Sequence, residues 1–405
     1  MAISEQRGAG EPDTASDATG VELSLVRDDI GFRIQRRLGL IPANGMGTSR
    51  RALIFAAITW LPLVVWAMLT GRGWSITGED SLFAHFGVHV RCLVAIPLLI
   101  VAEDIAQKSV PPLLRYFVES GLVTTERVPQ FRALIASVVR LRNGVLPWVM
   151  ILGVAIAWSS AGAVFRQFED MSWAAAGGEA DSEITFGGWW FVLVIRPIFT
   201  ALLLAWLWRA CLVFVLTLKL AKFPLALVPT HPDRVGGLGF YERLVFIFSP
   251  VAFAVSAVAA ASFAHNVVYH GVSVMAIKGV LIATAVLVTI IFLVPLMPLA
   301  LLLGKVKRQA IFDYGSIVGH HGRLVHRRWV LSEEIGSPAI LDAPELGPVA
   351  DVQSIFASVL HMRKFPISKL GVAAIAVPAA IPVLIVAGMQ LPIQSLLLTV
   401  LKTLI

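Results

Sequence analysis

Two arginines lie deep inside stretches of sequence that are otherwise apolar enough to cross a lipid bilayer. Arg91 and Arg196 occupy different stretches, and His89 precedes Arg91 by two positions. An ionisable side chain inside a membrane span marks a functional site by default. Because a guanidinium binds a carboxylate or phosphate through two parallel hydrogen bonds, Arg196, Arg91 and His89 are candidates for an anion site or pathway.

A structural explanation of the two arginines competes with this interpretation. Arg91 lies near enough to one end of its stretch to reach lipid phosphate. Arg196 can pair with a carboxylate of the loop before its own stretch, such as Glu169 or Asp170. The sequence leaves both explanations open.

Two adjacent carboxylates, Glu103 and Asp104, follow directly after the apolar stretch that contains Arg91. In that position they are candidates for binding a cation or relaying protons. The alternative is that they end the span and pair with arginines of the neighbouring loops.

The most distinctive loop is Thr230–Phe240, which has three glycines in four positions. Glycine permits backbone conformations that other residues avoid, so exposed amides here can form an anion-binding nest. The candidate residues of this loop are His231, Asp233, Arg234, Gly236, Gly237 and Gly239. The alternative is a structural turn that fixes one span to the next.

We find no pattern that predicts catalysis, a cofactor or a metal. His-Glu-x-x-His and Gly-x-Ser-x-Gly are absent from the sequence, as is an intramembrane aspartate pair. Three histidines lie near one acid, but Gly319 and Gly322 are expected to break the helix among them. These four residues are Asp313, His320, His321 and His326. A solvated basic segment explains them better than a metal site, so no catalytic residue, no metal and no cofactor is assigned.

Composition places the chain in a membrane. Of the 405 residues 57% are hydrophobic and 15% are charged, and the mean hydropathy is +0.80. Soluble domains carry about 25% charged residues. The net charge of +7 is explained by the lysines and arginines of cytoplasmic loops, so we expect no nucleic-acid partner.

The apolar stretches predict an all-α, polytopic bundle of about seven transmembrane helices. The expected spans are 52–70, 86–102, 145–165, 188–208, 244–264, 279–303 and 371–389. Pro378 and Pro382 leave open a re-entrant hairpin in place of the last span. The stretch Ile393–Ile405 is too short to cross and is interpreted as an interfacial tail.

The distribution of basic residues predicts the orientation. With the N-terminus in the cytoplasm, 26 of the 33 lysines and arginines fall in the four inner segments and four fall in outer segments. Cytoplasmic loops carry such an excess. We therefore expect a multi-pass protein of the bacterial inner membrane with a cytoplasmic N-terminus.

Four parts organise the chain. Residues 1–50 are expected to form a disordered tail with an amphipathic helix at Val21–Leu40, which lies either on the inner leaflet or against the protein itself. Residues 51–304 form six spans with a helical cytoplasmic insert at 103–144, residues 305–369 form a cytoplasmic helical segment, and residues 370–405 form the last span and tail.

Two further patterns concern packing. Span five carries small residues four positions apart, which allow close helix approach and predict a central place in the bundle. They are Ala252, Ser256, Ala260 and Ala264. No internal repeat at a fixed period is evident.

Two segments, VPTHPDRVGGLGF (228–240) and ADVQSIFASVLHMRKFP (350–366), together with the arrangement of spans, carry a resemblance. They resemble a recurrent bacterial family of multi-pass membrane proteins over roughly residues 85–405. The resemblance implies a bacterial origin and the same number of spans. It implies no activity and no binding residues.

Three hypotheses about function follow. The first is a pathway for small solutes or ions, with a preference for anions. The second is a membrane sensor or scaffold that acts through segments 103–144 and 305–369. The third is an enzyme that processes lipid headgroups. The expected partners are the lipid bilayer, a small anion or lipid headgroup, and further copies of the chain in a homo-oligomer.

Overall fold

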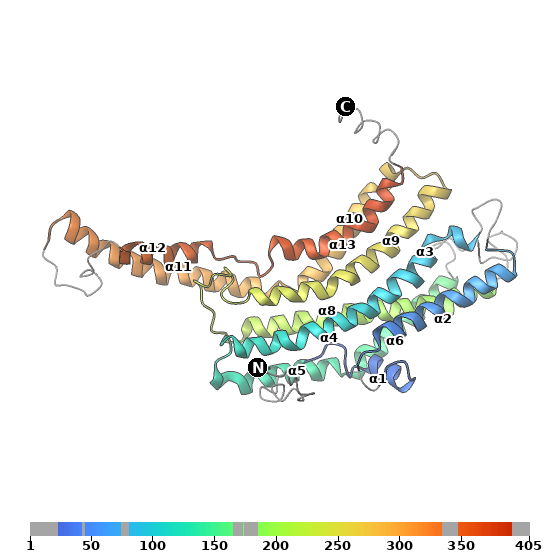
Figure 1. Ribbon diagram of the computed structural model, residues 1–405, viewed down its shortest axis with the longest axis horizontal. Helices are drawn as coiled ribbons and strands as arrows, with labels where there is room; N and C mark the ends of the chain where they lie inside the picture. The colour runs from blue at the N-terminus through green and yellow to red at the C-terminus, as the bar shows by residue number, and fades with distance from the viewer. Residues whose placement is uncertain are drawn as a thin grey trace, which may run out of the picture.

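The computed structural model describes residues 23–42, 45–73, 81–164, 173, 185–333 and 347–390, and these form an all-α bundle without a strand (Figure 1). Seven helical stretches are long and apolar enough to cross a membrane. They are Thr48–Leu69, Phe86–Glu119, Thr125–Ser160, Phe186–Lys222, Gly239–Tyr269, Val274–Leu296 and Lys369–Gly388. The predicted fold class is confirmed, and the protein is an integral, multi-pass membrane protein.

The helices follow one another through the described residues. They are α1 (Ile30–Arg37), α2 (Thr48–Leu69), η1 (Leu82–Ala84), α3 (Phe86–His89), η2 (Val90–Ala95), α4 (Ile96–Glu119), η3 (Thr125–Arg127), α5 (Val128–Arg142), α6 (Val145–Val164), α7 (Phe186–Trp190), η6 (Phe191–Ile195), α8 (Arg196–Lys222), η7 (Gly239–Phe248), α9 (Ser249–Tyr269), α10 (Val274–Leu293), η8 (Val294–Leu296), α11 (Pro298–Val325), η9 (His326–Val330), α12 (Gly347–His361) and α13 (Lys369–Gly388).

Four of the spans are longer than 30 residues, and two of these four contain the candidate arginines Arg91 and Arg196. The stretches Phe86–Glu119 and Phe186–Lys222 contain 34 and 37 residues, whereas about 20 residues cross the hydrocarbon core. Helix α4 continues past residue 102, the predicted end of the second span, through Glu103 to Glu119. The continuations of α4 and α8 lie beside α5 (Figure 1).

Two segments of the bundle, 86–97 and 186–197, repeat the same local structure, although the sequence predicted no internal repeat. Both α4 and α8 are preceded by a π-helical turn, η2 and η6, and both have proline at their second position, Pro97 and Pro197. Segments 86–97 and 186–197 each begin with Phe-Gly and end with Pro. In both segments, Leu and Val occupy the fourth and third positions before that proline. Proline cannot donate a backbone hydrogen bond, so the ladder of helical hydrogen bonds is interrupted there.

Each repeated segment belongs to a helical pair. The preceding span α2 packs against α4, and α6 packs against α8. The hydroxyl of Ser159 in α6 donates to the carbonyl of Val192 in η6. Such a partner satisfies backbone groups that a bulge frees inside a membrane.

Helix α9 takes the central place that its small residues predict. Ala252, Ser256, Ala260 and Ala264 are all buried, and α9 packs against α4, α10 and α13. Two-thirds of its span is buried inside the protein, a larger share than in the other six described spans. Helix α13 is continuous through Pro378 and Pro382, so the re-entrant hairpin is excluded for residues 369–388.

Helices α11 and α12 form a paired arm that projects from one end of the bundle (Figure 1). The expected helix break at Gly319 and Gly322 is wrong, because α11 runs on to Val325 and continues as η9. Lys307 Nζ donates to the carbonyls of Leu360 (2.7 Å) and Met362 (2.6 Å), which ties the two helices together. We call the end of the bundle that carries this arm the arm end.

The N-terminal segment differs from the helix expected at Val21–Leu40. Only α1 is helical, since residues 23–29 have no regular structure and Asp29 caps the helix by accepting from the Phe32 amide at 2.6 Å. Asp28 has a left-handed φ of 68°, which also prevents an earlier start. The segment packs on the protein itself. Residues 1–22 of the predicted tail and the stretch Ile393–Ile405 lie outside the described residues.

Candidate functional site

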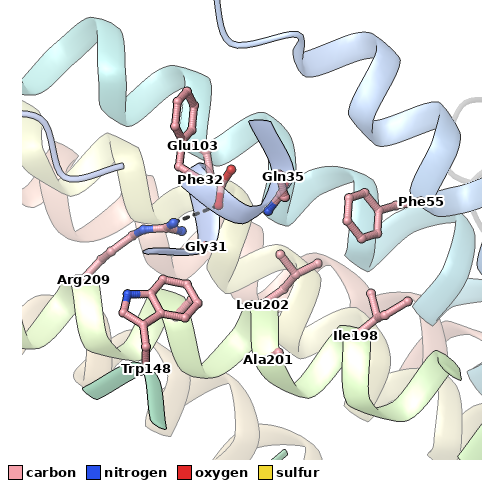
Figure 2. A pocket seen from close by; sticks show the side chains of 11 residues that line it. Gly31, Phe32, Gln35, Phe55, Glu103, Trp148, Ile198, Ala201, Leu202 and Arg209 are labelled. Carbon is pink, nitrogen blue, oxygen red and sulfur yellow. Dashed lines mark ion pairs between the residues drawn. The ribbon is translucent and has the colours of Figure 1, made fainter. Parts of the chain in front are cut away.

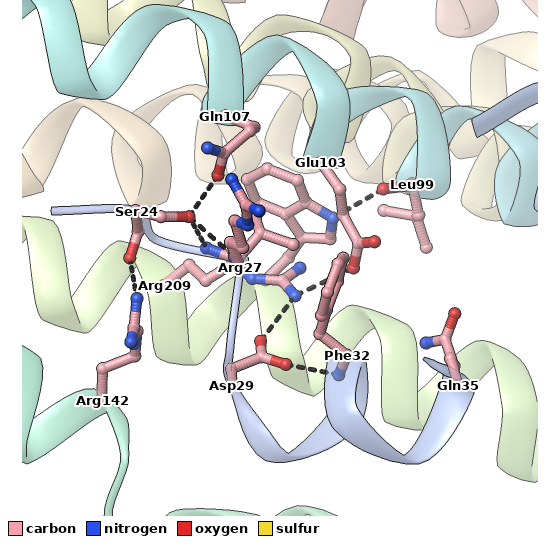
Figure 3. A network of polar contacts seen from close by, with 12 residues as sticks. Ser24, Arg27, Asp29, Phe32, Gln35, Leu99, Glu103, Gln107, Arg142 and Arg209 are labelled. Carbon is pink, nitrogen blue, oxygen red and sulfur yellow. Dashed lines mark hydrogen bonds and ion pairs between the residues drawn. The ribbon is translucent and has the colours of Figure 1, made fainter. Parts of the chain in front are cut away.

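Residues 23–32, which we call the plug, contact α4, α5 and α8, and bury five of their ten side chains while Arg27 and Asp28 stay exposed. Leu23, Leu25 and Val26 are at most 1% exposed. The hydroxyl of Ser24 donates to the amide oxygen of Gln107 in α4, and Arg142 of α5 donates to the Ser24 carbonyl (Figure 3). A chain segment outside the spans is thus inserted among them.

A buried ionic cluster holds the plug. Arg209 of α8 contacts both Asp29 of the plug (3.1 Å) and Glu103 of α4 (2.8 Å), and Glu103 also pairs with Arg51 of α2. Arg51 Nε in turn donates to Gln35 of α1 at 2.7 Å. Each of these four charged residues is at most 3% exposed to solvent. Buried charges require partners, and two cations here balance two anions.

Asp29 is the one member of this ionic cluster that comes from the plug and not from a span. Burial raises the pKa of its carboxyl above the ordinary value, while Arg209 and the Phe32 amide act in the opposite direction. The attraction of Arg209 therefore keeps an ionised group in a place where solvation alone would disfavour it. Without Arg209 the buried Asp29 carboxylate would lose its ion-pair partner, and this loss would oppose the apolar burial of Leu23, Leu25 and Val26.

A cavity of about 150 Å³ adjoins the cluster (Figure 2). Its walls come from the plug and α1, and from α2, α4, α6 and α8. They are formed by Gly31, Phe32, Gln35, Phe55, Glu103, Trp148, Ile198, Ala201, Leu202, Ala205 and Arg209. A cavity of this size holds a molecule about as large as benzene. Apolar walls beside a few polar groups are typical of a small-molecule site.

Hydrogen-bond donors predominate among the polar groups without partners around this cavity. Trp148 Nε1 is buried, and no described residue accepts its hydrogen bond. The same holds for Nε and Nη1 of Arg209. These groups favour a small ligand that carries an acceptor, such as an anion.

The structure brings Arg91, just before α4, and Arg196, the first residue of α8, together within the bundle. Both are buried, and both place their guanidinium carbon over the ring of Phe191, at 5.2 and 5.7 Å from its centre. Arg91 also lies over Phe199. Aromatic faces attract a desolvated cation. The cavity beside Arg209 is not lined by either residue.

His89 has a well-defined hydrogen-bond arrangement. Its Nδ1 accepts from Trp60 Nε1 at 2.9 Å, so its Nε2 donates to the Leu82 carbonyl at 3.0 Å. The ring also stacks on Phe83. This arrangement fixes one neutral tautomer and holds segment 82–89 against α2.

The adjacent acids Glu103 and Asp104 have separate surroundings. Glu103 points into the ionic cluster, whereas Asp104 pairs with the exposed Lys108 one turn later at 2.7 Å. They do not form one site. The expected arginine partners of Glu103 are present, but they belong to spans and not to loops.

The glycine-rich loop uses its exposed amides internally. The Asp233 carboxylate accepts from the amides of Val235 (2.9 Å), Gly237 (3.1 Å) and Gly239 (2.8 Å), and it lies 2.9 Å from His231 Nδ1. Partial burial opposes ionisation, yet these donors hold the pKa of Asp233 below its ordinary value. The nest therefore binds a carboxylate of its own chain, which favours the structural turn.

Left-handed backbone at three positions makes this turn possible. Arg234, Gly236 and Gly237 have φ values of 60°, 71° and 96°. The Arg234 carbonyl accepts from the Arg363 amide at 2.6 Å. The two segments that carry the family resemblance, 228–240 and 350–366, thus contact each other.

Sequence reasoning missed most of the ionic cluster. Arg51 and Arg209 were interpreted as charges that flank spans, and Asp29 as part of a helix. The local signal was weak: three apolar residues, Leu23, Leu25 and Val26, interrupt an otherwise polar tail just before Asp29.

Comparison with known proteins finds no matching family model, no matching curated protein and no matching solved structure. The resemblance of segments 228–240 and 350–366 to a bacterial membrane family stays a prediction. Within the described residues, no group of three or more metal-binding side chains is placed to hold a metal ion.

Proposed function

We propose that this protein is a pathway for small solutes, preferring anions, in the bacterial inner membrane, and that the plug closes its cytoplasmic end. One observation carries the proposal. The plug comes from outside the spans, buries Leu23, Leu25 and Val26 against the bundle, and is held through Asp29 by Arg209, which belongs to a span. Segments held in this way are suited to open and close a site.

The order of features along the bundle supports a pathway. Along α8, which runs towards the arm end, Arg196 comes first, the cavity-lining residues Ile198 to Arg209 follow, and Arg209 holds the plug. Buried guanidinium groups at both ends suit anions. The distribution of lysine and arginine favours the arm end as the cytoplasmic one.

Anion flux into proteoliposomes tests the proposal. Cysteines introduced at Ser24 and Gln107, in a background with Cys211→Ser, allow a short reducible thiol cross-linker to lock the plug. We expect chloride, nitrate or formate flux that stops on cross-linking and returns on reduction. The single variant Ser24→Cys, treated in the same way, is the control. Arg196→Ala should reduce flux without loss of folded protein.

The result against the proposal is equally clear. If Arg209→Met, which removes the partner of Asp29, conducts none of these anions although the protein is folded, no pathway lies behind the plug. Arg209 would then serve only to anchor the N-terminal segment.

The arm favours a scaffold as the second candidate function. Phe312, Ile317 and Trp329 lie outside the candidate spans, yet each is more than half exposed. Lysines and arginines surround them, including Arg308 and Arg327. An exposed apolar surface with basic neighbours suits a protein partner of acidic character.

Photo-cross-linking in native membranes tests the scaffold. A photoreactive residue at position 312 or 329 should give a discrete adduct with an acidic soluble protein, and the same residue at exposed position 116 of α4 should not. Adducts with lipid alone at both positions would contradict this function.

The lipid-headgroup enzyme receives less support from the cavity. Its lining includes Glu103, Arg209 and Gln35 but no serine, threonine, cysteine or histidine. Glu103 is engaged by two arginines, which suits neither a general base nor a nucleophile.

A further inference from the structure

A second hollow lies on the opposite side of α8, where its last turns face the start of α11. Its volume is about 930 Å³, within the range of about 300–1,000 Å³ usual for small-molecule sites. It is lined by Phe214, Leu218, Ala221, Lys222, Phe223, Met297, Pro298, Ala300, Leu301, Leu302 and Lys305. All of these residues are apolar except two lysines.

The two walls repeat the same spacing. On α8, Phe214 and Leu218 precede Lys222 by eight and four positions. Because residues four apart lie on one face of a helix, they form an apolar stripe that ends in a lysine.

The wall from α11 matches it. Met297 and Leu301 precede Lys305 by the same eight and four positions. Both helices run towards the arm end, so both lysines lie at the same end of the hollow, and both are exposed. Leu301 is 80% exposed, which is costly in water and favourable against an acyl chain.

We propose that this hollow binds an anionic glycerophospholipid, with its phosphate at Lys222 and Lys305 and an acyl chain along the two stripes. A lysine ammonium binds phosphate as a point charge, and basic pockets between spans on the cytoplasmic side bind anionic headgroups. The polarity of the hollow agrees with the predicted orientation, because its lysines face the arm end and its apolar stripes extend towards the membrane interior.

Native mass spectrometry of the purified protein with added phosphatidylglycerol tests this site. The double variant Lys222→Gln/Lys305→Gln should weaken binding about 30-fold, equivalent to about 1 kcal/mol for each lysine near the membrane surface. The matched control Lys278→Gln/Lys364→Gln removes two exposed lysines elsewhere and should change binding less than about threefold. Phosphatidylcholine with the same chains should bind more weakly than phosphatidylglycerol.

Further measurements distinguish binding of the lipid from binding of a simple anion. Leu301→Asn should weaken lipid binding at least about threefold, because it removes apolar contact while the fold is unaffected at so exposed a position. Inorganic phosphate should bind far more weakly than the lipid. If phosphate binds as tightly, if phosphatidylcholine binds equally well, or if both double variants lose binding alike, the proposal is wrong. Should the double variant unfold, the two single variants decide, with about fivefold weakening expected from each.

Discussion

Replacing Arg209 with methionine should release the plug from the bundle while leaving the spans folded. Methionine keeps much of the apolar volume of the arginine stem, so packing against Trp206 is largely retained. Glu103 keeps its pair with Arg51, but Asp29 is left ionised and buried with only the Phe32 amide as a partner.

The size of the effect follows from this loss. Removing one partner of a buried ion pair costs about 3–5 kcal/mol, because the other charge stays buried without compensation. With about 1.4 kcal/mol for each factor of ten, opening of the plug should become roughly two to four orders of magnitude more frequent.

Hydrogen exchange read by mass spectrometry measures this opening directly. Peptides covering 23–40 should lose protection by that factor in Arg209→Met, whereas peptides from α9 should not change. Adding Asp29→Asn removes the uncompensated charge and should restore protection to within about tenfold of the wild type. Asp29→Asn alone should have a small effect, because Arg209 keeps its ion pair with Glu103 and an asparagine oxygen can still accept from the Phe32 amide.

Asp28 provides the matched control for this rescue. It is the exposed neighbour of Asp29, and asparagine tolerates its left-handed backbone. Arg209→Met/Asp28→Asn should remain as open as Arg209→Met. If Asp28→Asn rescues as well as Asp29→Asn, or if Arg209→Met leaves residues 23–40 protected, the reasoning about the ionic cluster is refuted.

Three further predictions concern the loop, the packing and the topology. Folding lowers the pKa of Asp233, so the ionised carboxylate stabilises the loop fully above its ordinary pKa of 3.8, and this stabilisation is lost as pH falls through the lower pKa of the folded protein. Hydrogen exchange of residues 228–240 should show this acid transition. Asp233→Asn should abolish it. Gly187→Ala places a methyl group 2.3 Å from the Trp66 ring and should destabilise the protein by about 1–3 kcal/mol in thermal unfolding, whereas Gly153→Ala, with open space around it, should not. A cysteine at exposed Arg37, in a Cys211→Ser background, should be labelled only from the cytoplasm, and labelling from the periplasm would reverse the orientation.

The fold was predictable where a pattern is local. Runs of apolar residues report directly on the solvent around a helix, so all seven spans could be found from sequence. The features that the sequence predicted wrongly depend on packing between helices that are far apart in the sequence. Helix α11 passes through Gly319 and Gly322 because α12 packs along it, and a Cβ at Gly315 would lie 3.6 Å from the Phe356 ring. Tertiary packing overrides the low helix propensity of glycine.

The ionic cluster was predictable only in part, because its members come from four separate segments. Arg51 and Glu103 are 52 positions apart, and Asp29 and Arg209 are 180 apart. No spacing rule connects such residues. A charge at the end of a span looks the same in sequence whether it faces water or a buried partner, so Glu103 and Arg209 could be placed near a boundary but not paired.

Helix α11 of the arm is long, and its joint to span six contains two prolines. Helix α11 contains 28 residues and follows span six after the short turn at Val294–Leu296, where the two prolines Pro295 and Pro298 interrupt the backbone ladder. At 1.5 Å per residue the helix is about 42 Å long, so a change of about 5° in its angle at this joint moves its tip by about 4 Å. A small change of angle at this joint would therefore be amplified at the tip of the arm.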